Sequence, residues 1–439
     1  MIEFVLLFLF AVGLLVCLIS GKSVFIALGI GYVYFIGYAL CKGYKIGQIA
    51  GFILQGVKVV KNVLINLLLI GCITAAWRAS GSIGYMIDLG IGCILPQIVL
   101  PGVFILCSVM SFLMGSAFGS SASAGVVCMA LAYGMGVNPV LAGGAIISGC
   151  YFGDRCSPVS TAMLLTSDLT KTKVHDNISS FLKSVTVPFI LTVGILTVLG
   201  VCLPQNNYKQ GLDYQLILNQ NYNLTIWTLI PVVAIIILAF KKVSTKGILL
   251  VSTLLALFVA CIWQQFDIIQ IPRLLITGFH TEVPQFETIM GGGGILSMLK
   301  AFGILFVSSG YSGLFSNTGF LKGLNGLIES VSRRIGIVTT MTLVATLIST
   351  ISCNQSLAII LTHDLCEKQN KDTARFAVLL ANTAVLIPAL IPWNTAGLVP
   401  VMNIDAPMKC IIAEFFIFLV PIWTIIRYQL FSTNKKFDQ

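Results

Sequence analysis

Long apolar runs alternate with short polar connections along the whole chain. A helix needs about 20 mostly apolar residues to cross the hydrocarbon core of a bilayer, and most of these runs approach that length. The pattern therefore predicts an all-α polytopic membrane protein with about 10–12 membrane segments. The expected spans are 2–20, 24–41, 62–78, 86–112, 123–150, 184–203, 223–240, 247–264, 294–313, 336–352, 376–392 and 408–430.

Two polar stretches interrupt the apolar pattern in each half of the chain. They are Gly115–Ser123 and Tyr151–Thr161 in the first half, and Ser349–Ser356 and Pro388–Thr395 in the second. Gly, Ser, Asn and Pro weaken helices, and irregular backbone at membrane depth is tolerated only inside protein or beside a water-filled cavity. We therefore expect broken or re-entrant helices at these stretches, around a central binding site.

The order of spans and interruptions repeats in the two halves. Similar local patterns recur in the same order, such as "AAWRASGSIG" at 75–84 and "VSSGYSGLFS" at 307–316, although chance similarity among Gly-rich and Ser-rich segments is the alternative. Because the second half starts on the opposite side of the membrane, the arrangement predicts inverted-topology repeats, which are typical of secondary transporters. The expected organisation is a first inverted repeat at 1–203, an extracellular linker at 204–222, a second inverted repeat at 223–430 and a cytoplasmic tail at 431–439.

Basic residues lie mainly in the short connections. The chain has 26 Lys and Arg against 16 Asp and Glu, a net charge of +10. Lys and Arg favour the cytoplasmic ends of membrane spans, so this excess is a topology signal rather than a nucleic-acid surface. It predicts a multi-pass protein of the cell membrane with cytoplasmic N- and C-termini. This orientation rests on four clusters of basic residues: Lys42, Lys45, Lys58 and Lys61; Lys171, Lys173 and Lys183; Lys241, Lys242 and Lys246; and Lys435 and Lys436.

The composition gives little support to an enzyme. The chain is 57% hydrophobic and 10% charged, and its 13 Cys residues are scattered without paired C-x-x-C spacing. The sequence shows no phosphate-binding loop, nucleophile elbow or paired catalytic carboxylates, and its three His residues form no metal-binding pattern. We expect no enzymatic activity and no cofactor. The expected partners are the lipid bilayer and a small transported solute.

Asp154 and Arg155 stand together in one of the polar stretches. Burying a carboxylate at membrane depth costs about 2.5–3.5 kcal/mol even on the most lenient scale, so Asp154 needs a partner or a function. The two residues could pair with each other or lie at a membrane boundary. Neighbouring side chains on a helix diverge, however, which indicates a separate partner for each.

Two further ionisable residues are weaker candidates. Glu414 interrupts the last apolar run, where it could bind a proton or pair with Lys409; we favour the pairing. Arg78 ends an apolar run and is expected to extend to the membrane interface.

Three segments resemble the NhaC family of sodium/proton antiporters. They are "AIISGCYFGDRCSPVS" at 145–160, the Gly- and Ser-rich run before it, and "LIPWNTAG" at 390–397, and the resemblance extends over most of the chain. It implies an exchanger built from inverted repeats that assembles as a homodimer. It also implies an ion or substrate site formed by Asp154, Ser157, Ser160, Gln355, Trp393, Asn394 and Thr395.

The chain departs from the family at two acidic positions. Thr161 begins the segment in which the family commonly has Asp-Thr-Thr-Asn, and Asn382 stands where the family commonly has the Asp of Glu-Asp-Ser. Sodium prefers oxygen ligands, which hydroxyls, amides and carbonyls also supply. Proton exchange needs a titratable group, and Asp154 is nearly the only obvious one at the centre.

Two transport hypotheses follow. In the first, the protein is a sodium/proton antiporter and Asp154 alternately binds sodium and a proton. The candidate shell is Ser120, Asp154, Ser157, Ser160, Thr161, Asn354, Gln355, Asn382, Trp393, Asn394 and Thr395. In the second, the cargo is a small organic anion or an amino acid, and Arg155 is its charged partner. A channel or a membrane scaffold is less favoured, because no repeated filter sequence is visible.

Overall fold

The computed structural model describes residues 2–20, 24–93, 95–202, 222–241, 243–281, 287, 290–320, 330, 332, 334–352, 354–370 and 372–434. Within these ranges the chain is helical, and extended pairing is confined to one isolated bridge between Phe279 and Gly292. The predicted linker at 204–222 lies outside the described residues except for Tyr222, as do residues 435–439 of the predicted tail.

The helices differ widely in length. The α-helices are α1 (Ile2–Ile19), α2 (Val24–Cys41), α3 (Ile46–Ala79), α4 (Ser82–Cys93), α5 (Pro96–Met114), α6 (Ala117–Ser120), α7 (Val126–Gly134), α8 (Pro139–Cys156), α9 (Thr161–Leu169), α10 (Val174–Cys202), α12 (Ile230–Phe240), α13 (Thr245–Trp263), α14 (Ile271–Thr277), α16 (Gly294–Thr318), α18 (Ile337–Ser352), α19 (Gln355–Cys366), α20 (Thr373–Thr383), α21 (Thr395–Asn403) and α22 (Phe415–Asn434). A π-helix, η1 (Ser121–Gly125), joins α6 to α7. Short 3-10 helices are η2 (Ile226–Leu229), η3 (Ile268–Gln270), η5 (Glu367–Gln369), η6 (Ile387–Leu390) and η7 (Met408–Ala413).

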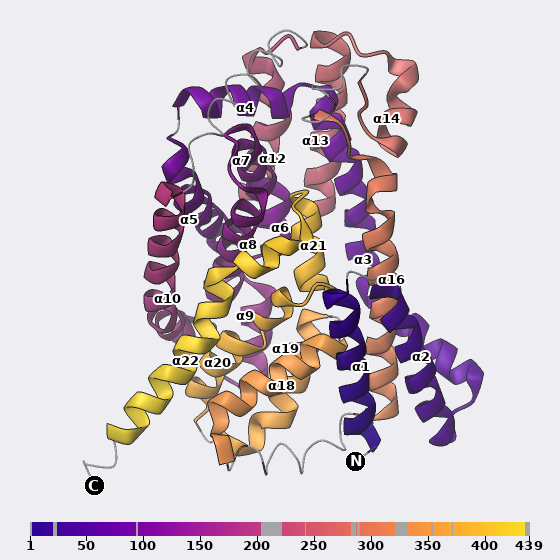
Figure 1. The fold of residues 1–439 in the computed structure, drawn as a ribbon, viewed down its shortest axis with the longest axis vertical. Helices are drawn as coiled ribbons and strands as arrows, with labels where there is room; N and C mark the ends of the chain where they lie inside the picture. Colours follow the sequence, from indigo (N-terminus) through magenta and orange to yellow (C-terminus); the bar gives the residue numbers. More distant parts are fainter. Residues whose placement is uncertain are drawn as a thin grey trace.

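The molecule is a multi-pass membrane protein. Among the described residues, 8 helices are long and apolar enough to cross a bilayer, and shorter apolar helices accompany them. The prediction of an all-α polytopic membrane protein is therefore confirmed. In Figure 1, α1 begins and α22 ends at the same end of the molecule.

Several expected spans have different boundaries in the structure. The span 86–112 is two helices, because Pro96 begins α5 after the end of α4. The span 123–150 is also two helices: Asn138 caps α8 and Pro139 begins it, and Pro favours the first helical position because its missing N–H needs no partner there. The less apolar stretch 45–61 is continuous with the next span, so that α3 is one helix of 34 residues.

Helices α3 and α16 form the longest packed pair, side by side in Figure 1. Their backbones meet where glycines face each other: a Cβ atom on Gly56 would lie 2.8 Å from the backbone N of Gly313 and still closer to the carbonyl O of Ser309. A hydrogen bond of 2.9 Å from Trp77 Nε1 to Ser252 Oγ adds α13 to this pair. Small residues allow such close approach, which is how membrane helices gain packing energy.

Short, broken helices occupy the middle of the molecule, where Figure 1 shows α6, α8, α9, α19 and α21 together. All four predicted polar stretches interrupt helices. Gly115 ends α5 in the left-handed conformation (φ 68°), which glycine adopts without strain, and Ser116 caps the next helix. The break after α18 is capped by Asn354. The last break begins at Ala384, before the predicted Pro388, and ends at Asn394.

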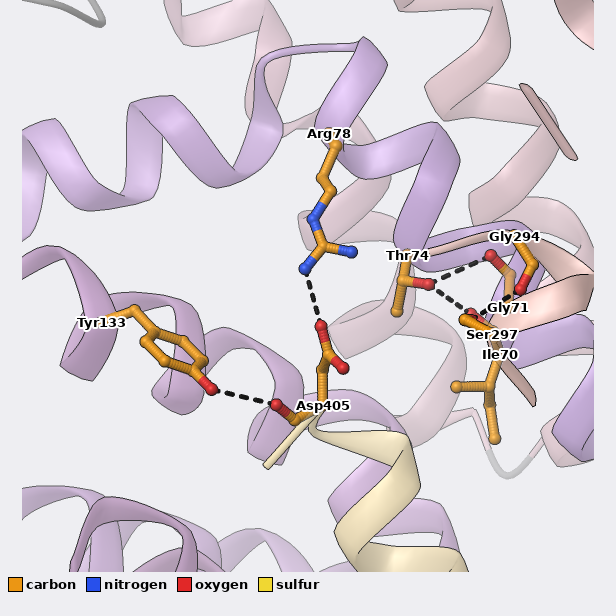
Figure 2. A network of polar contacts seen from close by, with 8 residues as sticks. All are labelled: Ile70, Gly71, Thr74, Arg78, Tyr133, Gly294, Ser297 and Asp405. Atoms are coloured by element: carbon orange, nitrogen blue, oxygen red, sulfur yellow. Dashed lines mark hydrogen bonds and ion pairs between the residues drawn. The ribbon is translucent and has the colours of Figure 1, made fainter. Parts of the chain in front are cut away.

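A polar network ties the end of α3 to the residues that follow α21 (Figure 2). Arg78 Nη2 lies 2.6 Å from Asp405 Oδ2, and Tyr133 Oη donates to the Asp405 carbonyl O at 3.0 Å. The side chain of Arg78 is only 12% exposed. Arg78 therefore has a carboxylate partner that the sequence did not indicate, the half-exposed Asp405, and its place at the membrane interface stays a prediction.

The α3–α16 contact generates a stability prediction. Gly56→Ala should destabilise the protein by about 1–3 kcal/mol, because the added methyl group meets backbone atoms that cannot move aside. Gly51→Ala on the same helix is the matched control, since nothing lies within 4 Å of its Cβ position. Thermal unfolding of the detergent-solubilised variants measures both. Equal melting temperatures for the two variants would contradict the packing described here.

Candidate functional site

Asp154 lies in the last turn of α8, inside the group of broken helices. Only 4% of the surface of Asp154 is exposed. Among the described residues, no Lys, Arg or His forms an ion pair with its carboxylate. Asp154 is therefore a buried acidic group whose charge must be stabilised by uncharged donors.

Three donors from different segments reach the carboxylate. Ser160 Oγ donates to Oδ1 at 3.1 Å, and Gln355 Nε2 donates to Oδ2 at 3.0 Å. The backbone N–H of Ala117 supplies a third hydrogen bond. Hydrogen bonds to a charged acceptor are stronger than neutral ones, so these contacts offset part of the cost of burial.

Each of the three donors belongs to the start of a helix. Ala117 is the first residue of α6, which continues through η1 into α7; Ser160 is the N-cap of α9; and Gln355 is the first residue of α19. The N-terminus of a helix carries a partial positive charge, which favours an anion. Three helix N-termini thus stabilise the Asp154 carboxylate in place of a cationic side chain.

Gln355 joins the first half of the chain to the second. Besides Asp154, its Nε2 donates to the carbonyl O of Val385 at 2.9 Å, in the irregular segment 384–394. That segment is held on α18 by Trp393, whose Nε1 donates to Thr350 O at 2.8 Å, and by Asn394, whose Nδ2 donates to Ser349 O at 2.8 Å. The structure therefore brings together Asp154, Ser160 and Gln355 from the predicted shell, and Trp393 and Asn394 hold a neighbouring segment in place.

Other predicted residues cap or support the helix breaks. The side chain of Asn354 accepts from Leu357 N at 3.2 Å, and that of Ser120 donates to Ser116 O at 2.9 Å. Ser157 is buried, and its Oγ accepts from Val159 N at 3.4 Å. Thr395 donates to Asn394 Oδ1 at 3.5 Å. Thr161 is exposed, so its expected place in the shell is wrong: it begins α9 with its side chain away from the buried carboxylate.

Arg155 belongs to a different cluster. Its guanidinium is buried between α8, α10 and α20, where it donates to Asn382 Oδ1 (2.9 Å from Nε), Phe181 O (3.0 Å) and Ser184 Oγ (2.7 Å). A second bond to Asn382, from Nη2, and a contact with Cys156 Sγ engage the remaining N–H groups. Arg155 and Asp154 thus have separate partners, as expected from their divergence on a helix.

This cluster corrects two expectations. Arg155 is not available as the partner of a substrate anion, because protein atoms accept from all five of its N–H groups. Asn382 lies in the Arg155 cluster instead of the Asp154 shell, and its Nδ2 donates to Thr424 Oγ1 at 2.9 Å. The cluster joins α8, α10, α20 and α22, which is a structural role.

Two backbone groups complete the site and gave no signal in the sequence. The Ala117 N–H and the Val385 carbonyl belong to apolar residues, so only the helix breaks beside them indicated their region. Together the site offers oxygens from one carboxylate, one hydroxyl and one backbone carbonyl, and the Gln355 amide nitrogen donates to two of these groups. Such oxygens can bind a small hard cation, and the carboxylate can alternatively bind a proton.

Comparison with known proteins agrees with this chemistry. The chain is 27% identical to the malate-2H(+)/Na(+)-lactate antiporter of Bacillus subtilis, over 88% of this chain and 86% of that protein. It is 23% identical to the Na(+)/H(+) antiporter NhaC of Alkalihalophilus pseudofirmus, over 85% of this chain and 83% of that protein. It is also 23% identical to the arginine/ornithine antiporter ArcD of Halobacterium salinarum, over 82% of this chain and 77% of that protein.

A family model matches the part of the chain that contains all of the site except the Ala117 N–H. The match covers residues 149–432, which include Asp154, Ser160, Gln355 and the irregular segment 384–394. The chain belongs to the Na+/H+ antiporter family.

Proposed function

We propose that the protein exchanges sodium ions for protons across the cell membrane, with Asp154 as the coupling residue. The observation that carries this proposal is a buried carboxylate that is held by helix N-termini and has no cationic side-chain partner among the described residues. A carboxylate bound permanently to Lys or Arg would have little need of a transported cation. Here sodium or a proton can provide the missing positive charge.

Competition for one negative charge gives the exchange. Sodium would bind the Asp154 carboxylate, with Ser160 Oγ and the Val385 carbonyl as neighbouring oxygens, and would displace the Gln355 Nε2 donor that bridges Asp154 and Val385. A proton on Asp154 removes the charge that attracts sodium. Because an uncompensated carboxylate is costly to move through the bilayer, either bound cation lowers the barrier to the conformational change.

Alternating access also depends on the arrangement of the chain. We propose that 1–203 and 223–430 are inverted repeats, and that segments 114–161 and 348–399 form a moving unit. The hydrogen bonds of Gln355 support this unit, because they connect the Asp154 region of the first half to Val385 of the second. A homodimer is the proposed assembly.

The proposed orientation places both termini in the cytoplasm. The basic clusters in the connections support it through the tendency of Lys and Arg to face the cytoplasm. Lys246 Nζ donates to Asn62 Oδ1 at 2.8 Å, next to Lys61, so two of these clusters lie together in the structure. The common end of α1 and α22 supports a common side for the two termini.

A second candidate cargo is a small organic anion that is exchanged or cotransported with a cation. Two of the similar proteins are named for the transport of organic acids or amino acids. The three helix N-termini around Asp154 favour it, since they would also attract a substrate carboxylate once a cation neutralised Asp154. Arg155 plays no part in this candidate, because its N–H groups are engaged.

Asp154→Asn should abolish sodium-driven proton movement, since an amide neither carries the charge nor binds the proton. The measurement uses purified protein in liposomes with an internal pH dye, an imposed pH gradient and added sodium, lithium or potassium. Asp168→Asn is the matched control, because Asp168 lies exposed on α9. Full exchange by Asp154→Asn would remove Asp154 from the mechanism. If none of the three cations changes the pH gradient in liposomes with the wild-type protein, the result would favour the organic-anion candidate.

Gln355→Ala should raise the half-saturation concentration for sodium by about tenfold, because without the link from Asp154 to the Val385 carbonyl two of the sodium oxygens are no longer held together, at a cost of roughly 1.4 kcal/mol. The variant loses both the bond to Asp154 and the link to Val385. Sodium-dependent exchange at a series of sodium concentrations gives the constant. Glu287→Gln, outside the site, should leave it unchanged. An unchanged constant in Gln355→Ala would exclude Gln355 from the sodium site.

Arg155→Gln should destabilise the protein by at least about 1–3 kcal/mol, because it leaves buried acceptor atoms of Asn382, Phe181 and Ser184 without their donors. Thermal unfolding in detergent measures the loss. Lys in place of Arg155 should be nearly as damaging, since an ammonium cannot reproduce the planar fork of donors. A stable Arg155→Gln protein with selectively weakened binding of organic anions would restore Arg155 as a substrate partner.

A further inference from the structure

A second buried carboxyl group lies outside the Asp154 site. Glu414 is 0% exposed and stands at the junction between the 3-10 helix η7 and α22. Its backbone (φ −77°, ψ 60°) departs from helical geometry, so the last membrane span, Met408–Tyr428, is broken at this residue. An acidic side chain at a helix break within a span is a place where transporters bind ions or protons.

The expected pairing of Glu414 with Lys409 is wrong. Lys409 is exposed, whereas neither carboxyl oxygen of Glu414 has a hydrogen-bond partner among the described residues. A carboxylate in this position would be a buried charge with no donor and no counter-charge, which costs several kcal/mol. Only the neutral acid fits the surroundings.

The groups that face Glu414 are also neutral. Cys150 and Tyr151 on α8 and Cys410 on η7 are the titratable residues that interact with it electrostatically within the described structure. The backbone just before Glu414 is pressed against α8, since a Cβ on Gly144 would lie within 2.6 Å of Ala413 atoms. Glu414 is therefore held close to the helix that carries Asp154.

Tyr151 connects the two acidic groups. It interacts electrostatically with both Asp154 and Glu414, and its hydroxyl donates to the Ala396 carbonyl O in the first turn of α21 at 2.7 Å. Asp154 lies one turn beyond Cys150 on α8, the helix against which Glu414 is held, so a negative charge on either carboxyl group raises the cost of a charge on the other in this poorly screened interior. Sodium bound at Asp154 would cancel one charge and make loss of a proton from the other group easier.

We propose that Glu414 is a second proton-binding site, which is protonated when Asp154 carries its negative charge and releases its proton when sodium neutralises Asp154. The use of this proton in exchange rests on the antiport proposed above. The presence of a proton on Glu414 is independent of that antiport and rests on the burial and missing hydrogen-bond partners of this side chain.

Infrared difference spectroscopy of the full-length protein in lipid tests the proton directly. A change from neutral to high pH should remove a carboxylic acid C=O band in the wild type. In Asp154→Asn, which lacks the negative charge that favours the proton on Glu414, the band should disappear at a lower pH. Glu414→Gln should lack this band, and Glu287→Gln, a matched carboxyl on the periphery, should keep it. Glu414→Asp retains an acid and should shift the band, which assigns it if the Gln variant does not fold. A band that persists unchanged in folded Glu414→Gln or Glu414→Asp overturns the site.

Transport by the same variants tests the coupling. Glu414→Gln should lower the number of protons moved per sodium by about twofold, because an amide cannot bind or release a proton while Asp154 still exchanges its own, and should keep sodium/sodium exchange near the wild-type rate. Proton movement at the wild-type rate in Glu414→Gln overturns the coupling role. If the wild type itself moves no protons with sodium, the antiport fails, and the loss of the infrared band in Glu414→Gln still supports the proton site.

Discussion

The stabilisation of one negative charge by helix N-termini is the constraint on which the central structure depends. Asp154 has no cationic side-chain partner in the described structure, so its charge relies on the Ala117 N–H, the Ser160 hydroxyl and the Gln355 amide. These groups can converge only if helices begin beside the carboxylate, and helices can begin there only if the membrane spans are broken. The breaks capped by Ser116, Ser160 and Asn354 are therefore requirements of the charge, and each interrupts an apolar run.

Helix α8 carries two neighbouring ionised residues, Asp154 and Arg155, and their surroundings differ. One can accept a further cation and the other has all its hydrogen bonds made by the protein. Asp154 has donors that a sodium ion or a proton could supplement, whereas Arg155 has every N–H group engaged by carbonyl, hydroxyl, amide and thiol groups. The guanidinium fixes α8 against α10 and α20, and the carboxylate one residue earlier is left for chemistry. Asn382 accepts from Arg155 without adding a negative charge. The centre thereby keeps a single negative charge at Asp154, with neutral surroundings at Glu414.

The sequence indicated those parts of the structure that depend on residue type. An Asp in a polar stretch between apolar runs marked the site, and clusters of Gly, Ser, Asn and Pro marked the four breaks. The direction of a buried side chain has no such signature, so the role of Arg155 and the place of Asn382 emerged only from packing. The Ala117 N–H and the Val385 carbonyl are backbone groups of apolar residues. Every residue type has such groups, so the pattern of polar and apolar residues could not indicate them. The expected span 123–150 merged two helices because the connection between them is itself apolar.

The glycine contact between α3 and α16 has a mechanical consequence. Two helices whose backbones touch at Gly56 and Gly313 have no layer of flexible side chains between them there, so neither can bend or slide without separating from the other. The α3–α16 pair therefore resists bending over most of the length of the molecule. If the broken helices move as proposed, they move relative to this rigid pair, and little of the free energy of ion exchange is lost in deforming it.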